Sequence, residues 1–172
     1  KLTNTAACTF TGKGLSFGGS LMRPEATGYG TVYFAQEMLS TRGQELAGKR
    51  VSVSGSGNVA QYAVEKAMQL GATVVTVSDS GGTVYDPAGF TPEKLAQLME
   101  IKNERYGRAS EYAALVGAQF LADQQPWSVP VDIALPCATQ NELDENHART
   151  LIQNGVLCVA EGANMPCTNE AA

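Results

Sequence analysis

The chain has 172 residues, of which 44% are hydrophobic and 17% charged, and its formal net charge is −5. This length and composition suit one domain with a sizeable core and exclude a disordered or collagen-like chain. The negative charge and the lack of a basic run exclude a nucleic-acid or membrane-surface protein, and no apolar stretch approaches the ~20 residues that cross a bilayer. We therefore expect small-molecule partners, with no nucleic acid and no membrane among them.

Residues 1–22 are rich in Thr, Gly and Ser, which predicts an irregular lead-in. The chain opens at Lys1 without a methionine and stops at Ala172 soon after a turn rich in Gly, Asn and Pro, so we expect a piece of a longer protein. A helix should follow the lead-in, because Pro24 suits a first helical turn and an apolar stripe continues to Arg42.

Strands and helices alternate over the rest of the chain. Runs of β-branched residues predict the strands, and apolar residues at helical spacing predict the helices. The predicted elements are strand 50–54, helix 58–70, strand 73–78, a short extended segment 83–85 at a sheet edge, helices 91–105 and 109–116, strands 119–121 and 131–135, helix 141–153 and strand 156–160. This order predicts an α/β fold with a doubly wound, mostly parallel, Rossmann-like sheet and helices on both faces.

A glycine-rich turn follows the first of these strands. Gly55 permits a tight turn, Gly57 lets a phosphate approach bare backbone, and the small Ala60 lets the helix pack close to the sheet. A dinucleotide pyrophosphate would then lie on the N–H groups at the start of the helix. The cofactor-binding residues predicted here are Gly55, Ser56, Gly57, Asn58 and Val59.

The cysteines are scattered, with no C-x-x-C spacing, and are interpreted as reduced thiols of a cytoplasmic protein. They are Cys8, Cys137, Cys158 and Cys167. Cys137 is interpreted as a packed thiol and not as a nucleophile, because no base is evident near it. No cluster of His, Cys and carboxylates has ligand spacing, so we predict no metal site.

Three further segments carry a family resemblance: KGLSFGGSLMRPEATGYG at 13–30, PCATQNE at 136–142 and EGANMP at 161–166. Together they resemble the NADP-dependent glutamate dehydrogenases of the bacterial hexameric type. The resemblance implies reversible reductive amination of 2-oxoglutarate by ammonia and NADPH to give L-glutamate. It also implies a homo-oligomer, a hexamer in the full-length enzyme.

That family has a substrate domain and a coenzyme domain with the active site between them. By resemblance, residues 1–22 are a lead-in from the substrate domain, and 23–172 are an incomplete coenzyme domain whose sheet is truncated at its C-terminal end. The family's catalytic lysine and aspartate precede the matched segments. We therefore predict no catalytic residue in this chain, and Lys13 is not the catalytic lysine.

The resemblance also assigns cofactor contacts. Arg23 and Thr27 correspond to the pair beside the nicotinamide carboxamide, although a helical Thr can simply bond its own backbone. Asn58 corresponds to a coenzyme-contacting Asn, with helix N-capping as the alternative role. After the later strands, where open α/β sheets bind ligands, the predicted contacts are Ala138, Thr139, Gln140 and Asn164.

The choice of cofactor depends on the end of the second strand. Asp79 there would, by the general rule, bond a ribose 2′-hydroxyl and favour NAD. Ser80 and the amides of the following glycines offer a phosphate site instead, and three bases gather at a suitable spacing: Lys102, Arg105 and Arg108. The alternative reading of the bases is a solvated helix end. The resembling enzymes tolerate an acid here, so we predict NADP, with NAD less favoured.

Two other functions remain open from the sequence. The first is another amino-acid dehydrogenase of the same superfamily, acting on leucine, phenylalanine or valine. The second is a nucleotide-binding module without catalysis.

Overall fold

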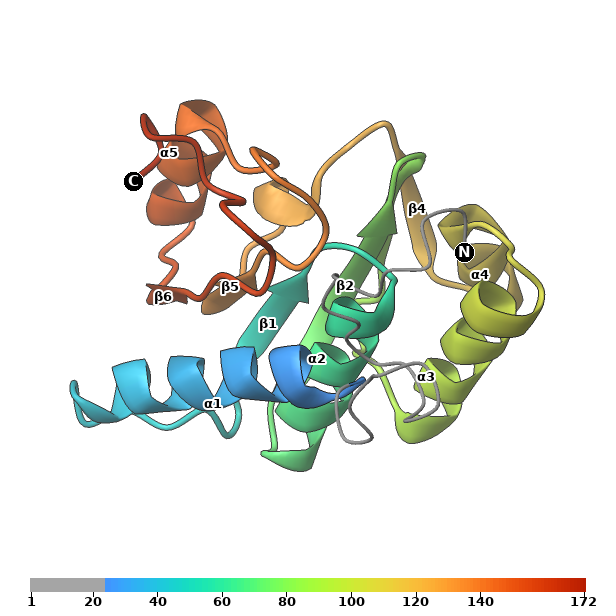
Figure 1. Ribbon diagram of the computed structural model, residues 1–172, viewed down its shortest axis with the longest axis horizontal. Helices are drawn as coiled ribbons and strands as arrows, with labels where there is room; N and C mark the ends of the chain where they lie inside the picture. Colours follow the sequence, from blue (N-terminus) through green and yellow to red (C-terminus); the bar gives the residue numbers. More distant parts are fainter. Residues whose placement is uncertain (1–23) are drawn as a thin grey trace, which may run out of the picture.

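The computed structural model describes residues 24–172, and the predicted lead-in at 1–22 lies outside them. Helices surround one six-stranded sheet (Figure 1). The helices are α1 (Ala26–Ser40), α2 (Asn58–Gln69), α3 (Pro92–Met99), the π-helix η2 (Glu100–Glu104), α4 (Ala109–Val116), the 3-10 helix η3 (Pro126–Ser128) and α5 (Glu145–Gln153). The strands are β1 (Arg50–Val53), β2 (Thr73–Asp79), β3 (Gly82–Tyr85), β4 (Gln119–Ala122), β5 (Ile133–Leu135) and β6 (Cys158–Val159).

The strand order is β4-β3-β2-β1-β5-β6. The pairs β1–β2, β1–β5 and β5–β6 are parallel, and β3 runs antiparallel to both of its neighbours. The predicted doubly wound, mostly parallel sheet is therefore confirmed. Because the chain moves outward from β1 in opposite directions to reach β2 and β5, the order reverses between β1 and β5, where such sheets bind their ligands.

The prediction that segment 83–85 lies at the sheet edge is wrong. It forms β3, which pairs with β2 on one side and with β4 on the other, so β4 is the edge strand. Gly82 permits this arrangement, since a Cβ there would lie only 2.4 Å from the Leu121 carbonyl oxygen. The close approach of β4 is a tertiary contact that the local pattern did not reveal.

Two apolar clusters lie on opposite faces of the sheet. The larger one joins Val74 and Val77 of β2 to α1, α2, α3 and α4, and the smaller one joins Val75 to the buried Trp127 and to Leu151 of α5. Helices on both faces were expected from the alternating pattern. Figure 1 shows α1 and α2 side by side, with α5 near the C-terminus on the β5–β6 side.

Several predicted boundaries shift, and the strand predicted at 131–135 is shortened to β5. The helix predicted at 91–105 is α3 followed by the π-helix, and the strand predicted at 156–160 shortens to β6. The helix predicted at 141–153 begins only at Glu145, because the Asp144 carboxylate caps it by accepting the His147 N–H at 2.9 Å. Residues 141–143 instead pair with the segment 165–168.

Candidate functional site

The glycine turn after β1 has the geometry expected of a dinucleotide cradle. Gly55 has a φ of +82°, and a Cβ on it would lie 3.1 Å from both the Ala138 Cα and the Cys137 carbonyl oxygen. Its N–H donates to the Ser78 hydroxyl at 2.8 Å. By contrast, a Cβ on Gly57 would meet no atom within 4 Å, so this backbone is open to an approaching ligand.

The predicted alternative role of Asn58 as a helix N-cap is wrong. Asn58 is the first residue of α2, and the N-cap is Gly57, which has no side chain to accept a hydrogen bond. The Asn58 side-chain amide donates instead to the Pro24 carbonyl, which links the start of α2 to the start of α1. Ser56 is buried, and its carbonyl accepts from the Gln61 side chain at 2.8 Å.

A cavity of about 460 Å³ lies beside the cradle, and we call it the switch-point pocket. Six of the residues predicted from the sequence line it: Thr27, Val59, Ala138, Thr139, Gln140 and Asn164. Three lining residues were not predicted: Cys137, Gly162 and Ala163. The pocket thus gathers residues from four separate parts of the chain at the carboxyl ends of β1, β5 and β6.

Hydrogen bonds between backbone groups hold two walls of this pocket together. The Pro136 carbonyl accepts from the N–H groups of Gly162 at 2.9 Å and Ala163 at 3.0 Å. Further along, the Asn141 N–H donates to the Met165 carbonyl at 3.0 Å. The loops after β5 and β6 therefore form one unit, although about twenty-five residues separate them along the chain.

Glu142 supports the wall formed by residues 138–140. Its Oε1 accepts from the N–H groups of Ala138 at 3.0 Å and Thr139 at 3.3 Å, and its carbonyl accepts from the Trp127 indole at 3.1 Å. The residue is only 6% exposed, and Oε2 has no hydrogen-bond partner within residues 24–172. Burial raises the pKa of this carboxyl, although the N–H groups of Ala138 and Thr139 oppose the rise.

Glycines bring α1 against the cradle helix. A Cβ on Gly28 would lie 2.6 Å from the Val59 carbonyl oxygen and 2.7 Å from the Ala63 nitrogen, so the backbones of α1 and α2 are in direct contact. Gly162 is equally tight, because a Cβ there would lie 2.7 Å from the Cys137 sulfur. Gly28 lies in the first turn of α1, and a glycine inside a predicted helix, where it is otherwise unfavourable, was the signal available in the sequence.

A charged cluster at the end of β2 forms the second half of the site. The Arg108 guanidinium donates to the Ser80 hydroxyl at 2.9 Å. The Lys102 ammonium lies 3.6 Å from the Asp79 carboxylate and donates to the Gly107 carbonyl at 3.0 Å. The structure therefore brings Lys102 and Arg108 together around the β2–β3 turn, as the sequence predicted.

Arg105 does not join this cluster. It follows the π-helix as an exposed residue, and within residues 24–172 no hydrogen bond or ion pair connects its side chain to the cluster. Arg23 lies outside the described residues, so its predicted contact stays a prediction.

Both oxygens of Asp79 are engaged within the protein. Oδ1 accepts from the Gly81 N–H at 2.9 Å, and Oδ2 accepts from the Ala109 N–H at 2.9 Å. Partial burial disfavours the charged form, but these N–H groups, with Lys102 and Arg108, hold the pKa of Asp79 below its usual value. The Gly81 N–H, expected to bind a phosphate, thus donates its hydrogen bond to Asp79 instead. This carboxylate organises the turn and the nearby bases.

Other features of the described chain are separate from this site. Cys137 is 7% exposed and burial raises the pKa of its thiol, which agrees with a packed, unreactive cysteine. Over residues 24–172, no group of His, Cys, Asp and Glu is arranged to hold a metal ion, and no helix is long and apolar enough to cross a membrane.

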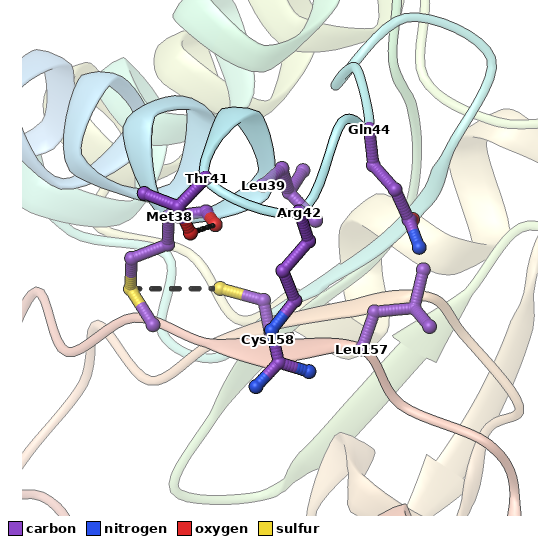
Figure 2. Close-up of a pocket in the computed structure, with 7 residues that line it drawn as sticks. All are labelled: Met38, Leu39, Thr41, Arg42, Gln44, Leu157 and Cys158. Carbon is purple, nitrogen blue, oxygen red and sulfur yellow. Dashed lines mark hydrogen bonds between the residues drawn. The ribbon is translucent and has the colours of Figure 1, made fainter.

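Figure 2 shows a second cavity, of about 230 Å³, at the other end of α1. Met38 and Cys158 line it side by side, with their sulfur atoms in contact at 3.8 Å. Arg42 and Leu157 also line it. Thr27 and Met38 are separated along α1 by about 16 Å. None of the residues predicted to bind a cofactor lines this cavity.

The doubly wound sheet, the glycine turn at its switch point and the charged cluster after β2 are the arrangement typical of dinucleotide-binding domains. The chain matches the Glutamate/Leucine/Phenylalanine/Valine dehydrogenase family over residues 18–172 and belongs to that family.

Several known glutamate dehydrogenases are similar to this chain over nearly its whole length. The NADP-specific glutamate dehydrogenases of Salmonella typhi and Escherichia coli are 70% and 68% identical to this chain, over 99% of its length. The structure of Plasmodium falciparum glutamate dehydrogenase covers 94% of the chain with a TM-score of 0.88 and 48% identity, and this chain spans 35% of that protein. A hetero-hexameric glutamate dehydrogenase from Thermus thermophilus has a TM-score of 0.70 and 28% identity over 94% of the chain, which spans 35% of it. The chain spans 38% of the length of the two bacterial relatives.

Proposed function

We propose that this chain is the coenzyme-binding part of an NADP-dependent glutamate dehydrogenase, which aminates 2-oxoglutarate reductively with ammonia and NADPH to give L-glutamate and catalyses the reverse reaction. The names of the bacterial relatives at 70% and 68% identity support this function. These names favour glutamate dehydrogenase over the leucine, phenylalanine and valine dehydrogenases and over a non-catalytic nucleotide-binding module.

The observation that carries the choice of NADP is the arrangement at the end of β2. An aspartate favours NAD when its carboxylate receives a ribose 2′-hydroxyl, but both Asp79 oxygens already accept backbone N–H groups. The nearby Arg108, Ser80 and Lys102 present cationic and hydroxyl donors, which suit a 2′-phosphate. We therefore assign the 2′-phosphate to these three side chains.

The rest of the cofactor follows from the direction of the sheet. We place the pyrophosphate on the backbone from Gly55 to Val59, at the N-terminus of α2, where N–H groups and the helix dipole favour an anion. We place the nicotinamide in the switch-point pocket. Its contacts would then be Thr27, Ala138, Thr139, Gln140 and Asn164, with Arg23 added by resemblance.

In this function the chain binds and orients the cofactor, and NADPH supplies the hydride when bound. The pocket walls made of backbone from residues 138–140 and 162–164 fix which face of the nicotinamide is presented. We assign no catalytic residue to this chain. Residues 1–22 would lead in from the substrate domain, and 23–172 would form an incomplete coenzyme domain.

We further propose that the whole enzyme is a cytoplasmic homo-oligomer, a hexamer at full length. The hetero-hexameric Thermus thermophilus relative supports the number of six subunits but not their identity, which we infer from the resemblance. Cysteines 137, 158 and 167 are free thiols, which suits a reducing compartment.

A parallel titration of the chain with NADPH and NADH tests the cofactor assignment. Reduced-nicotinamide fluorescence reports binding, and quenching of the single Trp127 reports it independently, because the Trp127 indole bonds the carbonyl of Glu142 behind the pocket wall. Selective NADPH binding supports the proposal. Tighter binding of NADH contradicts it.

A second experiment tests the activity itself. The chain joined to the family's substrate domain should oxidise NADPH when 2-oxoglutarate and ammonia are both present. Turnover with a branched-chain or aromatic 2-oxo acid in place of 2-oxoglutarate would contradict the choice of substrate, and the absence of any turnover would favour a binding module.

A further inference from the structure

Two amide side chains connect the glycine cradle to the π-helix. Gln61 lies in α2 and is only 2% exposed, whereas Asn103 lies in the π-helix and is exposed at the surface. Each amide donates to the other: Gln61 Nε2 to Asn103 Oδ1 and Asn103 Nδ2 to Gln61 Oε1, both at 3.0 Å. Gln61 Nε2 also donates to the Ser56 carbonyl at 2.8 Å. This amide pair therefore joins the cradle turn to a helix far from it in sequence.

The π-helix presents one of the bases of the charged cluster. Lys102 precedes Asn103 directly, and its ammonium lies 3.6 Å from Asp79. A π-helical turn is rare and is frequently found at functional sites. A π-helix has more residues in each turn than an α-helix. If α3 continued as a regular α-helix, the side chains after it would point in directions that differ by about 100° for each residue of difference in the turn. The orientation of Lys102 thus depends on whatever selects the π-turn.

We propose that Gln61 and Asn103 are positioning residues for cofactor selectivity: by holding the π-turn against α2, they aim Lys102 at the 2′-phosphate. The pair links the backbone assigned to the pyrophosphate with the side chains assigned to the 2′-phosphate. The amide pair therefore sets the distance between the place assigned to the pyrophosphate and the place assigned to the 2′-phosphate. This inference rests on the proposed function, because it requires the 2′-phosphate to lie beside Lys102.

Within residues 24–172, the other hydrogen bonds of this turn do not connect it to α2. Lys102 itself donates to the Gly107 carbonyl, and Gly107 donates its own N–H to the Ile101 carbonyl at 2.8 Å, so these bonds close the turn on itself. Buried Leu95, Leu98 and Ile101 anchor the run by apolar packing, which is not directional. The amide pair supplies a directional contact to α2 beside Lys102, and a reciprocal pair accepts little variation in geometry.

The test compares Asn103→Ala with the unaltered chain in NADPH and NADH titrations. Loss of the directional contact should raise the Kd for NADPH about five- to tenfold, since hydrogen bonds to a charged group are partly lost. The Kd for NADH should change less than twofold. Truncation of the exposed Asn103 leaves Gln61 Oε1 without its donor but open to water, so the melting temperature should fall by no more than ~4 °C.

Gln97→Ala is the matched control, because it removes another exposed amide from the same helical run and should leave both affinities unchanged. Gln61→Met and the double variant complete a cycle, and the double variant should lose no more NADPH affinity than the stronger single one. Equal loss of both coenzymes, or no loss, in Asn103→Ala would overturn the inference. If the unaltered chain itself does not prefer NADPH, the proposed function fails first.

Discussion

The two ends of the candidate cofactor site are built in different ways. The end near β2 consists of charged side chains that contact one another, with Asp79 beside Lys102 and Arg108 on Ser80. The switch-point pocket is lined by neutral groups and by backbone from loops that are held from behind by the buried Glu142. Cofactor binding at the β2 end therefore depends on charge, whereas binding at the switch-point pocket depends on where the backbone of its loops is placed.

This difference predicts different consequences of mutation. A substitution in the charged cluster should change which cofactor binds while leaving the fold intact, because long exposed side chains contribute little to stability. A substitution behind the pocket should change stability as well, since it exposes or strands buried backbone groups.

The largest effect is expected where the two ends meet, at Gly55. Gly55→Ala adds a Cβ at a positive φ and 3.1 Å from the Ala138 backbone, so it should lower the free energy of unfolding by about 3 kcal/mol. Urea unfolding measures this loss, and NADPH titration should show that binding is abolished.

Gly57→Ala is the matched control for that variant. Gly57 has a negative φ and open space around its Cβ position, so stability should change by no more than about 0.5 kcal/mol. NADPH binding should still weaken, because the methyl group intrudes on the assigned pyrophosphate. A large loss of stability here would show that the cradle is not open.

A substitution at Arg108 should affect the charged end alone. Arg108→Ala removes the donor beside Ser80 and should cost about 2 kcal/mol of NADPH binding, roughly thirtyfold in Kd, with NADH binding unchanged. Arg105→Ala is the matched control, because it removes the same charge from a residue with no contact in the cluster. It should raise the Kd for NADPH much less. Equal losses of NADPH and NADH in Arg108→Ala would remove the assignment.

A substitution at Glu142 should affect the pocket end alone. Glu142→Ala leaves the N–H groups of Ala138 and Thr139 without their acceptor, which should cost about 2 kcal/mol of stability. Glu142→Gln retains a carbonyl acceptor and should lose less. Chemical unfolding of the two variants side by side tests this, and equal losses would mean that the hydrogen bonds contribute nothing.

The smallest effect is a pH dependence at the same residue. The pKa of Glu142 is raised in the folded state, so the folded chain holds this proton more tightly than the unfolded chain. Its contribution to stability is therefore present below the ordinary Glu pKa and is lost as the pH rises through the raised value. The free energy of unfolding, measured at a series of pH values across this range, should fall less steeply with pH in Glu142→Gln than in the unaltered chain. Identical slopes would contradict the role of burial.

Much of the architecture was determined by local sequence. Continuous β-branched runs predicted the parallel strands, which are buried on both faces, and helical periodicity predicted the helices, which bury one face. The glycine turn was predictable for a similar reason, since the positive φ of Gly55 is a property of the residue itself. The resemblance in three motifs then indicated the family, and the match over residues 18–172 confirmed it.

Only the tertiary structure decided how the predicted residues combine. Asp79 suggested NAD by its position, yet its role depends on the Ala109 N–H, which folding brings from thirty residues away. The same holds for Arg105, which is separated from Arg108 by three positions but not drawn into the cluster, and for β3, which the approach of β4 moves off the edge. Hydrogen bonds of this kind are set by distances between remote segments, and no local pattern in the chain specifies those distances.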